Sequence, residues 1–264
     1  MNAELLLRFT LDCDRAYLYA HPEHELTADE RSRYDDALAQ RAAGIPAQYI
    51  TGHQEFWGLD LIVTPAVLIP RPETEHLIEA VLELIEQDSQ RAGSRVSIVD
   101  VGTGSGCIAI ALARELPQAT IDATEISPDA LEVARANAAR HQLQNRIRFH
   151  RADLLAGLAH SSFDFAVSNP PYVGESEEDQ VQLEVRKFEP RSAVFAGPRG
   201  TEVIERLIPQ AALALKPGGW LVMEISGTIA KAVEAMLSGW NDVRAVDDLQ
   251  GIPRVVLARK PHEG

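Results

Sequence analysis

The sequence lacks the features that mark several specialised classes of protein. It has only two cysteines, Cys13 and Cys107, far apart in what its apolar spacing predicts to be two helices, so a disulfide framework is not expected. No uninterrupted apolar run of about 18 residues occurs, so no membrane span is expected either. The first residues lack the basic start and apolar core of a signal peptide. We therefore expect a cytoplasmic protein.

Positive charge is also scarce. The 264 residues include 25 Lys and Arg against 39 Asp and Glu, a formal net charge of −14. Such a surface repels DNA and RNA unless a local basic patch compensates, and the arginines are spread along the chain. The eight histidines are scattered, and the closest pair, His21 and His24, has no third ligand nearby, so no metal site is expected. The one dense charge run, 175–184, is acidic, and a solvated loop is its simplest interpretation.

The pattern of the chain divides it into three parts. Residues 3–20 and 27–43 have apolar residues at helical spacing, which predicts a small helical domain over residues 1–45. Residues 46–72 are predicted to form a hairpin-like connector, because short apolar runs alternate there with turn residues. The remaining residues, 73–264, form the third and largest part.

From residue 96 onward, predicted strands alternate with predicted helices, which is typical of a parallel sheet covered on both faces. Two closing strands are joined by a short turn that favours antiparallel pairing. The expected fold is α/β, a Rossmann-like, mostly parallel sheet like that of class I methyltransferases, although fold alone does not establish function. The predicted strands are 96–101, 119–125, 146–150, 163–168, 219–226, 241–246 and 253–259, and the helices between them are 106–115, 127–141, 201–215 and 228–238.

A glycine-rich loop, Gly102-Thr103-Gly104-Ser105-Gly106, joins the first of these strands to the first helix. Glycines there let the backbone turn sharply and let a ligand approach, and the helix N-terminus offers free N–H groups. The loop suits a dinucleotide or S-adenosylmethionine. In the dinucleotide fingerprint the third glycine comes one residue later, where Cys107 stands, so NAD is disfavoured. A phosphate-binding P-loop is excluded, since no Gly-Lys-Ser/Thr follows.

Acidic residues end or follow the next two strands. Glu125 can accept both ribose hydroxyls of a nucleoside lying across the sheet, because strand ends at the switch point face the cofactor crevice. An alternative role for an acid there, favouring the positive end of the next helix, fits Asp129 better. After the third strand, Asp153 can accept a hydrogen bond from an adenine amino group, with Leu154 against the ring.

The tetrapeptide Asn169-Pro170-Pro171-Tyr172 follows an apolar strand. Its two prolines stop the strand, and the carbonyls of Asn169 and Pro170 can project stiffly because they do not join a ladder. This arrangement suits a polar clamp for an NH₂ group. Asn-Pro also often makes a simple strand-ending turn, so the tetrapeptide alone leaves both interpretations open.

The glycine loop, the acid and the tetrapeptide occur in the order and spacing of amino-group methyltransferases. Further segments make nearly the whole chain resemble the peptide chain release factor N5-glutamine methyltransferases. There are departures: Glu125 stands where the family usually has Asp, Ser226 where Gly is common, and the loop 197–201 is less acidic. None of them lies within the tetrapeptide. The segments that carry the resemblance are 44–52, 55–56, 67–75, 188–190, 215–219 and 251–254.

This resemblance implies a mechanism and a substrate. Asn169 through its side-chain oxygen and Pro170 through its backbone carbonyl would accept the two N–H bonds of a glutamine amide, with Tyr172 as an apolar wall and Pro171 keeping the turn rigid. The implied substrate is the glutamine of the Gly-Gly-Gln motif in class I release factors. The helical domain either helps to hold this large substrate or stabilises the third part of the chain by packing against it. The implied cofactor is S-adenosyl-L-methionine, bound in the third part of the chain by Gly102, Thr103, Gly104, Ser105, Gly106, Glu125, Asp153, Leu154 and Asn169.

Three alternatives stay open at this point. The same clamp could take a glutamine of ribosomal protein L3. It could also take the exocyclic amine of adenine in DNA or RNA, although that enzyme would have to flip its base and grip phosphates, which the charge of −14 opposes. A scaffold without activity would be revealed by failure to bind S-adenosylmethionine. As a further hypothesis, the acidic loop 174–184 steers a basic partner surface toward the tetrapeptide.

Overall fold

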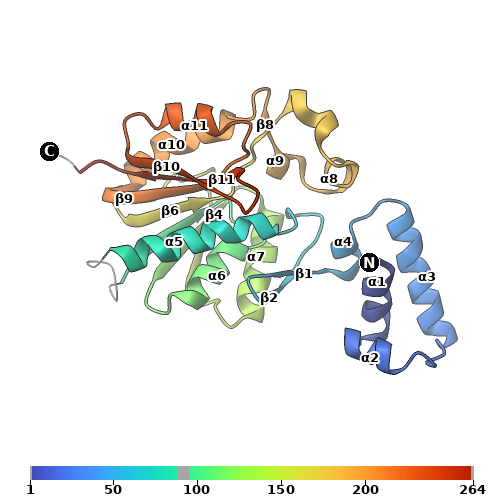
Figure 1. Cartoon of the computed structure of the whole chain (residues 1–264). Coiled ribbons are helices and arrows are strands. Elements are labelled where there is room, and N and C mark those ends of the chain that lie inside the picture. Colours follow the sequence, from blue (N-terminus) through green and yellow to red (C-terminus); the bar gives the residue numbers. More distant parts are fainter. Residues whose placement is uncertain (1, 89–94, 263–264) are drawn as a thin grey trace.

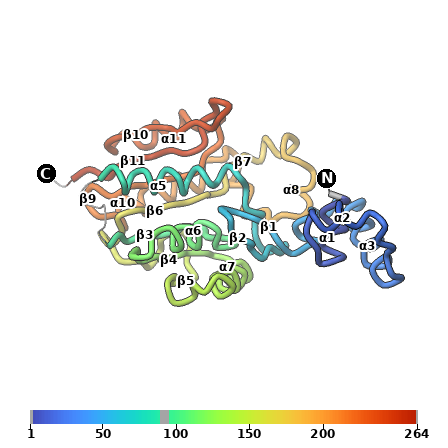
Figure 2. The backbone as a smooth tube through the Cα atoms, turned by 60° about the horizontal axis from the view of Figure 1, so that its bottom comes forward, coloured from blue at the N-terminus to red at the C-terminus, as the bar shows by residue number. Residues whose placement is uncertain are grey.

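The computed structural model describes residues 2–88 and 95–262. Its N-terminal helices are α1 (Asn2–Leu11), α2 (Arg15–Ala20) and α3 (Ala28–Ala42), and in two views they lie apart from the sheet, at one end of the molecule (Figures 1 and 2). The prediction of one continuous helix over 3–20 was wrong. Asp12 has a φ of +50°, which ends α1, and the Asp14 side chain then caps α2 by accepting from Tyr17 N at 2.7 Å.

This break also changes the place of one cysteine. Cys13 lies in the turn between α1 and α2, and not in a helix as predicted, whereas Cys107 is the first residue of α6 (Cys107–Glu115). Both are free thiols. Burial raises the pKa of Cys107 to about 12, so this thiol stays protonated at neutral pH.

The connector contains the predicted hairpin, preceded by a short helix that was not predicted. Helix α4 (Ala47–Thr51) leads into β1 (His53–Phe56) and β2 (Leu59–Ile62), which pair antiparallel across Trp57 and Gly58. Both turn residues have positive φ, as a tight hairpin turn requires. The buried side chain of Asn137 then joins β2 to the glycine loop, because its Oδ1 accepts from Ile62 N at 2.7 Å and its Nδ2 donates to Ser105 O at 2.9 Å.

A seven-stranded sheet forms the centre of the fold, with the order β10-β11-β9-β6-β3-β4-β5. The strands from β9 to β5 are parallel, and β11 runs antiparallel to both of its neighbours. The predicted fold class is therefore confirmed, although β9 begins at residue 215 and not at 219. The strands are β3 (Ser97–Val101), β4 (Thr120–Glu125), β5 (Ile147–Arg151), β6 (Phe163–Ser168), β9 (Leu215–Glu224), β10 (Asn241–Asp247) and β11 (Pro253–Arg259).

Helices cover both faces of this sheet because its strands are apolar on both sides. Along β3, Ile98 packs in the cluster that contains α5 and α6, whereas Val99 packs with α10 and α11. Helix α5, which was not predicted, brings Leu77, Val81 and Leu84 to the first cluster. The bounds of the remaining helices on the two faces are α5 (Glu75–Gln87), α7 (Pro128–Arg140), α10 (Glu202–Ala214) and α11 (Ala230–Met236).

Short elements between β6 and α10 form a wall beside the carboxyl ends of the strands. The predicted acidic loop is largely helical there, and three of its carboxylates are paired: Glu178 with Arg191, Asp179 with Arg186, and Glu184 with Arg41 of α3. The last pair joins the N-terminal helices to this wall. These elements are β7 (Val173–Gly174), η2 (Glu175–Gln180), α8 (Leu183–Phe188), α9 (Arg191–Val194) and β8 (Phe195–Gly197). No helix in the described ranges has the length and apolar character to cross a membrane.

Candidate active site

The glycine loop lies between the end of β3 and the start of α6. Gly102, Gly104 and Gly106 have φ values of +72°, +55° and +85°, a region that side chains rarely adopt. A Cβ at Gly106 would lie 3.3 Å from Ala134 of α7, whereas one at Gly102 would meet nothing within 4 Å. The third glycine is therefore needed for helix packing. The first two leave the backbone open to a ligand.

Two buried acceptors stand beside this loop. Asp100 of β3 is fully buried, and its Oδ2 accepts from Thr103 Oγ1 at 2.6 Å and from Ala109 N at 3.2 Å. Its Oδ1, like Thr124 Oγ1 at the end of β4, has no hydrogen-bond partner among the residues that the structure describes. Burial raises the pKa of Asp100 to about 7. Unpartnered buried oxygens next to an open loop suit the polar groups of a ligand.

Neither Asp100 nor Thr124 was predicted from the sequence as a site residue. The available signal was a carboxylate inside an apolar strand directly before a glycine loop, a place where an unpaired charge is costly. In the sequence, however, Asp100 is one residue of an apolar strand, and Thr124 stands directly before the more conspicuous Glu125.

The predicted ribose acid lies against the glycine loop. Glu125 Oε2 accepts from Gly104 N at 3.0 Å, and Oε1 accepts from Ser127 N at 2.9 Å. Each carboxylate oxygen has a second lone pair, so a ligand hydroxyl can still bind. The structure thus brings Glu125 together with the loop, as its position after the second strand of the unit predicted.

Asp153 and Leu154 lie in the next turn along this edge. Ala152 N donates to Glu125 O at 3.0 Å, which holds the turn beside the loop. The Asp153 carboxylate is about half exposed and forms an ion pair with Arg206 of α10, while Leu154, with a φ of +54°, packs against the α10–α11 side of the core. An adenine amino group would therefore have to share Asp153 with Arg206.

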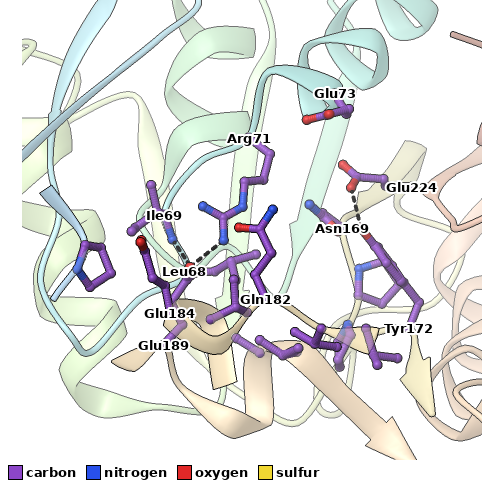
Figure 3. Close-up of a pocket in the computed structure, with 18 of the residues that line it drawn as sticks. Leu68, Ile69, Arg71, Glu73, Asn169, Tyr172, Gln182, Glu184, Glu189 and Glu224 are labelled. Atoms are coloured by element: carbon purple, nitrogen blue, oxygen red, sulfur yellow. Dashed lines mark hydrogen bonds and ion pairs between the residues drawn. The ribbon is translucent and has the colours of Figure 1, made fainter. Parts of the chain in front are cut away.

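The tetrapeptide Asn169–Tyr172 leaves the sheet at the end of β6. Ser168 Oγ donates to Val101 O at 2.7 Å, so this point is tied to the strand that feeds the glycine loop. All four residues line a pocket of about 500 Å³. Figure 3 shows Asn169, Tyr172 and Glu224 together on one side of this pocket and Arg71, Ile69 and Glu189 on the other.

A chain of hydrogen bonds fixes the Asn169 side of the pocket. Asn169 Nδ2 donates to Thr74 Oγ1 at 3.0 Å, and Thr74 Oγ1 donates to Glu224 Oε2 at 2.6 Å. The Tyr172 hydroxyl donates to the other oxygen, Oε1, at 3.2 Å. Glu224 is only 2% exposed, and burial raises the pKa of its carboxyl. Neither Thr74, which ends η1 (Pro72–Thr74), nor Glu224, which ends β9, was predicted from the sequence as a site residue.

The opposite side is fixed by a second buried acid. Glu189 accepts from Ile69 N at 3.2 Å and forms an ion pair with Arg71. The Tyr49 hydroxyl of α4 donates to Val67 O at 2.6 Å, which anchors the same segment from outside. The segment 67–72 is thereby held as a firm edge of the pocket.

Comparison with known proteins shows which protein family the chain belongs to. The model of the PrmC N-terminal domain family matches residues 1–52, and that of the methyltransferase small domain family matches residues 79–187. A release factor glutamine methyltransferase of Koribacter versatilis is 57% identical over 262 residues, covering 99% of this chain and 91% of the relative. One of Xylella fastidiosa is 41% identical over 263 residues, covering 99% and 93%.

The chain belongs to the release factor glutamine methyltransferase family. As a member it is an enzyme, a methyltransferase, and the resemblance seen in the sequence motifs is confirmed. The fold agrees: the N-terminal domain of human METTL16 in complex with SAH has a TM-score of 0.55 at 20% identity, covering 85% of this chain and 82% of that one. At this identity the likeness concerns the fold alone. The roles of the individual residues stay predictions.

Proposed function

We propose that this methyltransferase transfers a methyl group from S-adenosyl-L-methionine to the side-chain nitrogen of the glutamine in the Gly-Gly-Gln motif of class I peptide chain release factors. The observation that carries the proposal is the position of Asn169–Tyr172, which line a pocket directly beside the strand end that feeds the glycine loop. The names of the full-length relatives support the choice of glutamine and of release factors. Release factors act in the cytoplasm, so we place the enzyme there.

The residues around the glycine loop fit S-adenosylmethionine. Gly102 and Gly104 leave space for close approach, the unpartnered Oδ1 of Asp100 suits the ammonium group, and Glu125 can accept ribose hydroxyls. The complete set proposed to hold the cofactor is Asp100, Gly102, Thr103, Gly104, Ser105, Gly106, Glu125, Asp153, Leu154 and Asn169. When bound, this cofactor supplies an activated methyl group on a sulfonium centre.

The protein must hold a poor nucleophile in line with that methyl group. An amide nitrogen is weakly nucleophilic because its lone pair is delocalised into the carbonyl. In our proposal Asn169 Oδ1 and the Pro170 carbonyl accept its two N–H bonds and aim the lone pair. Positioning of this kind is worth up to about 7–11 kcal/mol of barrier when alignment is good.

The same two oxygens stabilise the charge that develops. As the N–CH₃ bond forms and the C–S bond breaks, the bonding pair leaves with sulfur and positive charge grows on nitrogen, which then loses a proton to water. Carbonyl dipoles aimed at the N–H bonds favour this charge, as an oxyanion hole favours a negative one. Tyr172, whose hydroxyl is held by Glu224, presents its ring to the substrate side chain, and Pro171 keeps the turn rigid.

We assign the three parts of the chain separate tasks. Residues 1–45 help to hold the large protein substrate, 46–72 connect and edge the pocket, and 73–264 bind the cofactor and carry the reaction. The ion pair between Arg41 and Glu184 supports this division, because it ties the helical part to a residue that lines the pocket.

A direct competition of substrates tests the proposal. Purified class I release factor, ribosomal protein L3 and duplex DNA are each incubated with the enzyme and S-adenosylmethionine, and any added methyl is located by fragment mass spectrometry. We expect a single methyl on the glutamine of Gly-Gly-Gln. Methylation of L3 or of adenine instead, or no methylation at all, would overturn the proposed function.

A further inference from the structure

We propose that Thr74 and Glu224 are positioning residues that determine which end of the Asn169 carboxamide faces the substrate. The inference rests on the proposed function and adds to it a reason why Asn169 presents oxygen, and not nitrogen, to the glutamine amide. Neither residue contacts the substrate nitrogen in this scheme. They act through Asn169.

The hydroxyl hydrogen of Thr74 fixes the orientation of the Asn169 carboxamide. A carboxylate only accepts hydrogen bonds, so an ionised Glu224 takes the hydroxyl hydrogens of both Thr74 and Tyr172. A hydroxyl has a single hydrogen, and that of Thr74 is thereby committed to Glu224. Thr74 Oγ1 can then only accept from Asn169, whose Nδ2 must point toward it. Asn169 Oδ1 is left for the pocket and has no partner among residues 2–88 and 95–262.

The opposite orientation of the Asn169 carboxamide would prevent it from accepting a hydrogen bond from the substrate amide. Turning the carboxamide by half a rotation places an NH₂ group where the substrate also offers NH₂, and two donors repel. An asparagine side chain has no intrinsic preference between these orientations, since oxygen and nitrogen are nearly equal in size. The preference must come from its neighbours, and the only side chain hydrogen-bonded to Asn169 within the described ranges is Thr74.

The burial of Glu224 strengthens this control. Glu224 is 2% exposed, at the end of β9, so little water competes for the two hydroxyl hydrogens. The charged and titratable groups around it are Tyr172, Glu73, Cys107 and Arg254, and Arg254 is itself paired with Asp248. Burial and Glu73 raise the pKa of Glu224, while Thr74, Tyr172 and Arg254 lower it.

Protonation of Glu224 should remove this control of the Asn169 orientation, which we call the lock and which consists of Thr74 and Glu224. A protonated carboxyl can donate to Thr74 Oγ1, which frees the threonine hydrogen to turn toward Asn169 and permits the flipped amide. Because the pKa of Glu224 is raised, this loss begins at a higher pH than for an ordinary carboxyl. The scheme therefore predicts that kcat falls as the pH is lowered through this pKa.

Paired substitutions at position 74 test the inference. In Thr74→Val the hydroxyl is lost with little change of shape, and we expect kcat on the release factor to fall about 10²-fold while the dissociation constant for S-adenosylmethionine stays within about twofold. Thr74→Ser keeps the hydroxyl and should retain kcat within about threefold. Equal kcat in Thr74→Val and in the wild type, or equal losses in the Val and Ser variants, would overturn the inference.

Two further measurements keep the test independent of folding and of the substrate. In Glu224→Gln the side chain keeps a single oxygen for the two hydroxyl hydrogens, so the hydrogen of Thr74 is no longer held by an acceptor in every molecule. We expect kcat to fall about threefold or more and to lose its acid limb. In the wild type, an NMR cross-peak from the Asn169 side-chain NH₂ protons to Thr74 should be present at neutral pH and weaken in acid. Its absence at neutral pH would refute the lock even if the glutamine is methylated. If the cross-peak is present but no glutamine is methylated, the proposed function fails and the lock stands.

Discussion

The two halves of the candidate active site are built in different ways. The glycine-loop half lies at the ends of β3 and β4, and nearly all of its hydrogen bonds have a backbone group on at least one side. Gly102 N and Thr103 N donate to Thr124 O, and the Glu125 carboxylate accepts from Gly104 N. The other half, which we call the clamp half, consists of Asn169–Tyr172 with Thr74 and Glu224, and its side chains bind each other across long stretches of sequence. Asn169 and Thr74 are 95 residues apart, and Thr74 and Glu224 are 150 residues apart. The first half depends on local conformation, and the second on tertiary packing.

This difference suggests that the halves can be damaged separately. A change of backbone conformation in the loop should affect the cofactor, while a change in the clamp should affect transfer and leave the cofactor bound. Where one substitution damages both, the halves are coupled more closely than their construction suggests.

Asn169→Ala should separate methyl transfer from cofactor binding more clearly than any other substitution proposed below. The side-chain oxygen proposed to accept from the substrate is removed, so we expect kcat to fall about 10³-fold, by analogy with deletion of one oxyanion-hole donor. Because Asn169 is only one of the ten residues proposed to hold the cofactor, the dissociation constant for S-adenosylmethionine, measured by calorimetry, should stay within about threefold. Full activity would refute the clamp, and loss of cofactor binding would refute the separation.

Asp100→Asn should change both the pH dependence of stability and the affinity for the cofactor. The raised pKa of about 7 means that the folded protein retains a proton that the unfolded chain releases above about pH 4. Unfolding therefore releases a proton between these values, and the wild type loses stability as the pH rises from about 4 to 7, by up to about 4 kcal/mol.

The asparagine variant lacks this titration. Its free energy of unfolding relative to the wild type should thus rise across the same window, as measured by urea denaturation at pH 5, 6, 7 and 8. A constant difference between the two proteins would show that Asp100 is ionised throughout. At pH 8, where Asp100 is ionised in the wild type, cofactor affinity should fall in the variant, since the charge proposed to meet the ammonium group is gone.

Two glycines offer a matched pair within the loop. In Gly106→Ala the new methyl group lies within 3.3 Å of α7 at a positive φ, so we expect a loss of about 2–3 kcal/mol of stability. In Gly104→Ala the methyl group is 4.0 Å from its nearest neighbour, Gly102 O. The strain there costs about 1–2 kcal/mol, and the main effect should be weaker cofactor binding. Equal losses of affinity in the two variants would contradict the roles assigned to them.

The smallest effect is expected from the acidic segment beside the clamp. We expect neutralising Glu175, Glu177, Glu178 and Asp179 together to slow methylation at low salt by about threefold, with less effect at high salt. Two of these charges are already paired with arginines, so Glu175→Gln alone should give much of the change. The matched control is Glu234→Gln on α11. A rate that is unchanged at low salt would refute the hypothesis that the acidic segment steers a basic partner surface.

The position of the glycine-loop half in the fold could be predicted from the sequence because its signals are local. Gly102–Gly106 lie between an apolar strand and an apolar helix, and Glu125 ends the next strand, so spacing along the chain indicated their common place. Asp100 was missed because a carboxylate within an apolar strand looks like an ordinary exception until its burial and its unpartnered oxygen are known.

Only part of the clamp half could be predicted. Asn169–Tyr172 were conspicuous, because two prolines after an apolar strand force a turn. Thr74 and Glu224 were not, because their meaning comes from a contact between the start of α5 and the end of β9. The break between α1 and α2 was missed for a similar reason: helical apolar spacing continues across it, and a single positive φ at Asp12 ends the helix.

The most direct test of the clamp is the structure of a complex with a Gly-Gly-Gln tripeptide and S-adenosylhomocysteine, the product left after methyl transfer. We predict that the glutamine side-chain nitrogen lies within hydrogen-bond distance, about 2.7–3.2 Å, of both Asn169 Oδ1 and the Pro170 carbonyl oxygen. We also predict that Asn169 Nδ2 still faces Thr74. A glutamine nitrogen bound elsewhere in the pocket, for example against Glu73, or an Asn169 that turns its nitrogen to the peptide, would contradict this account.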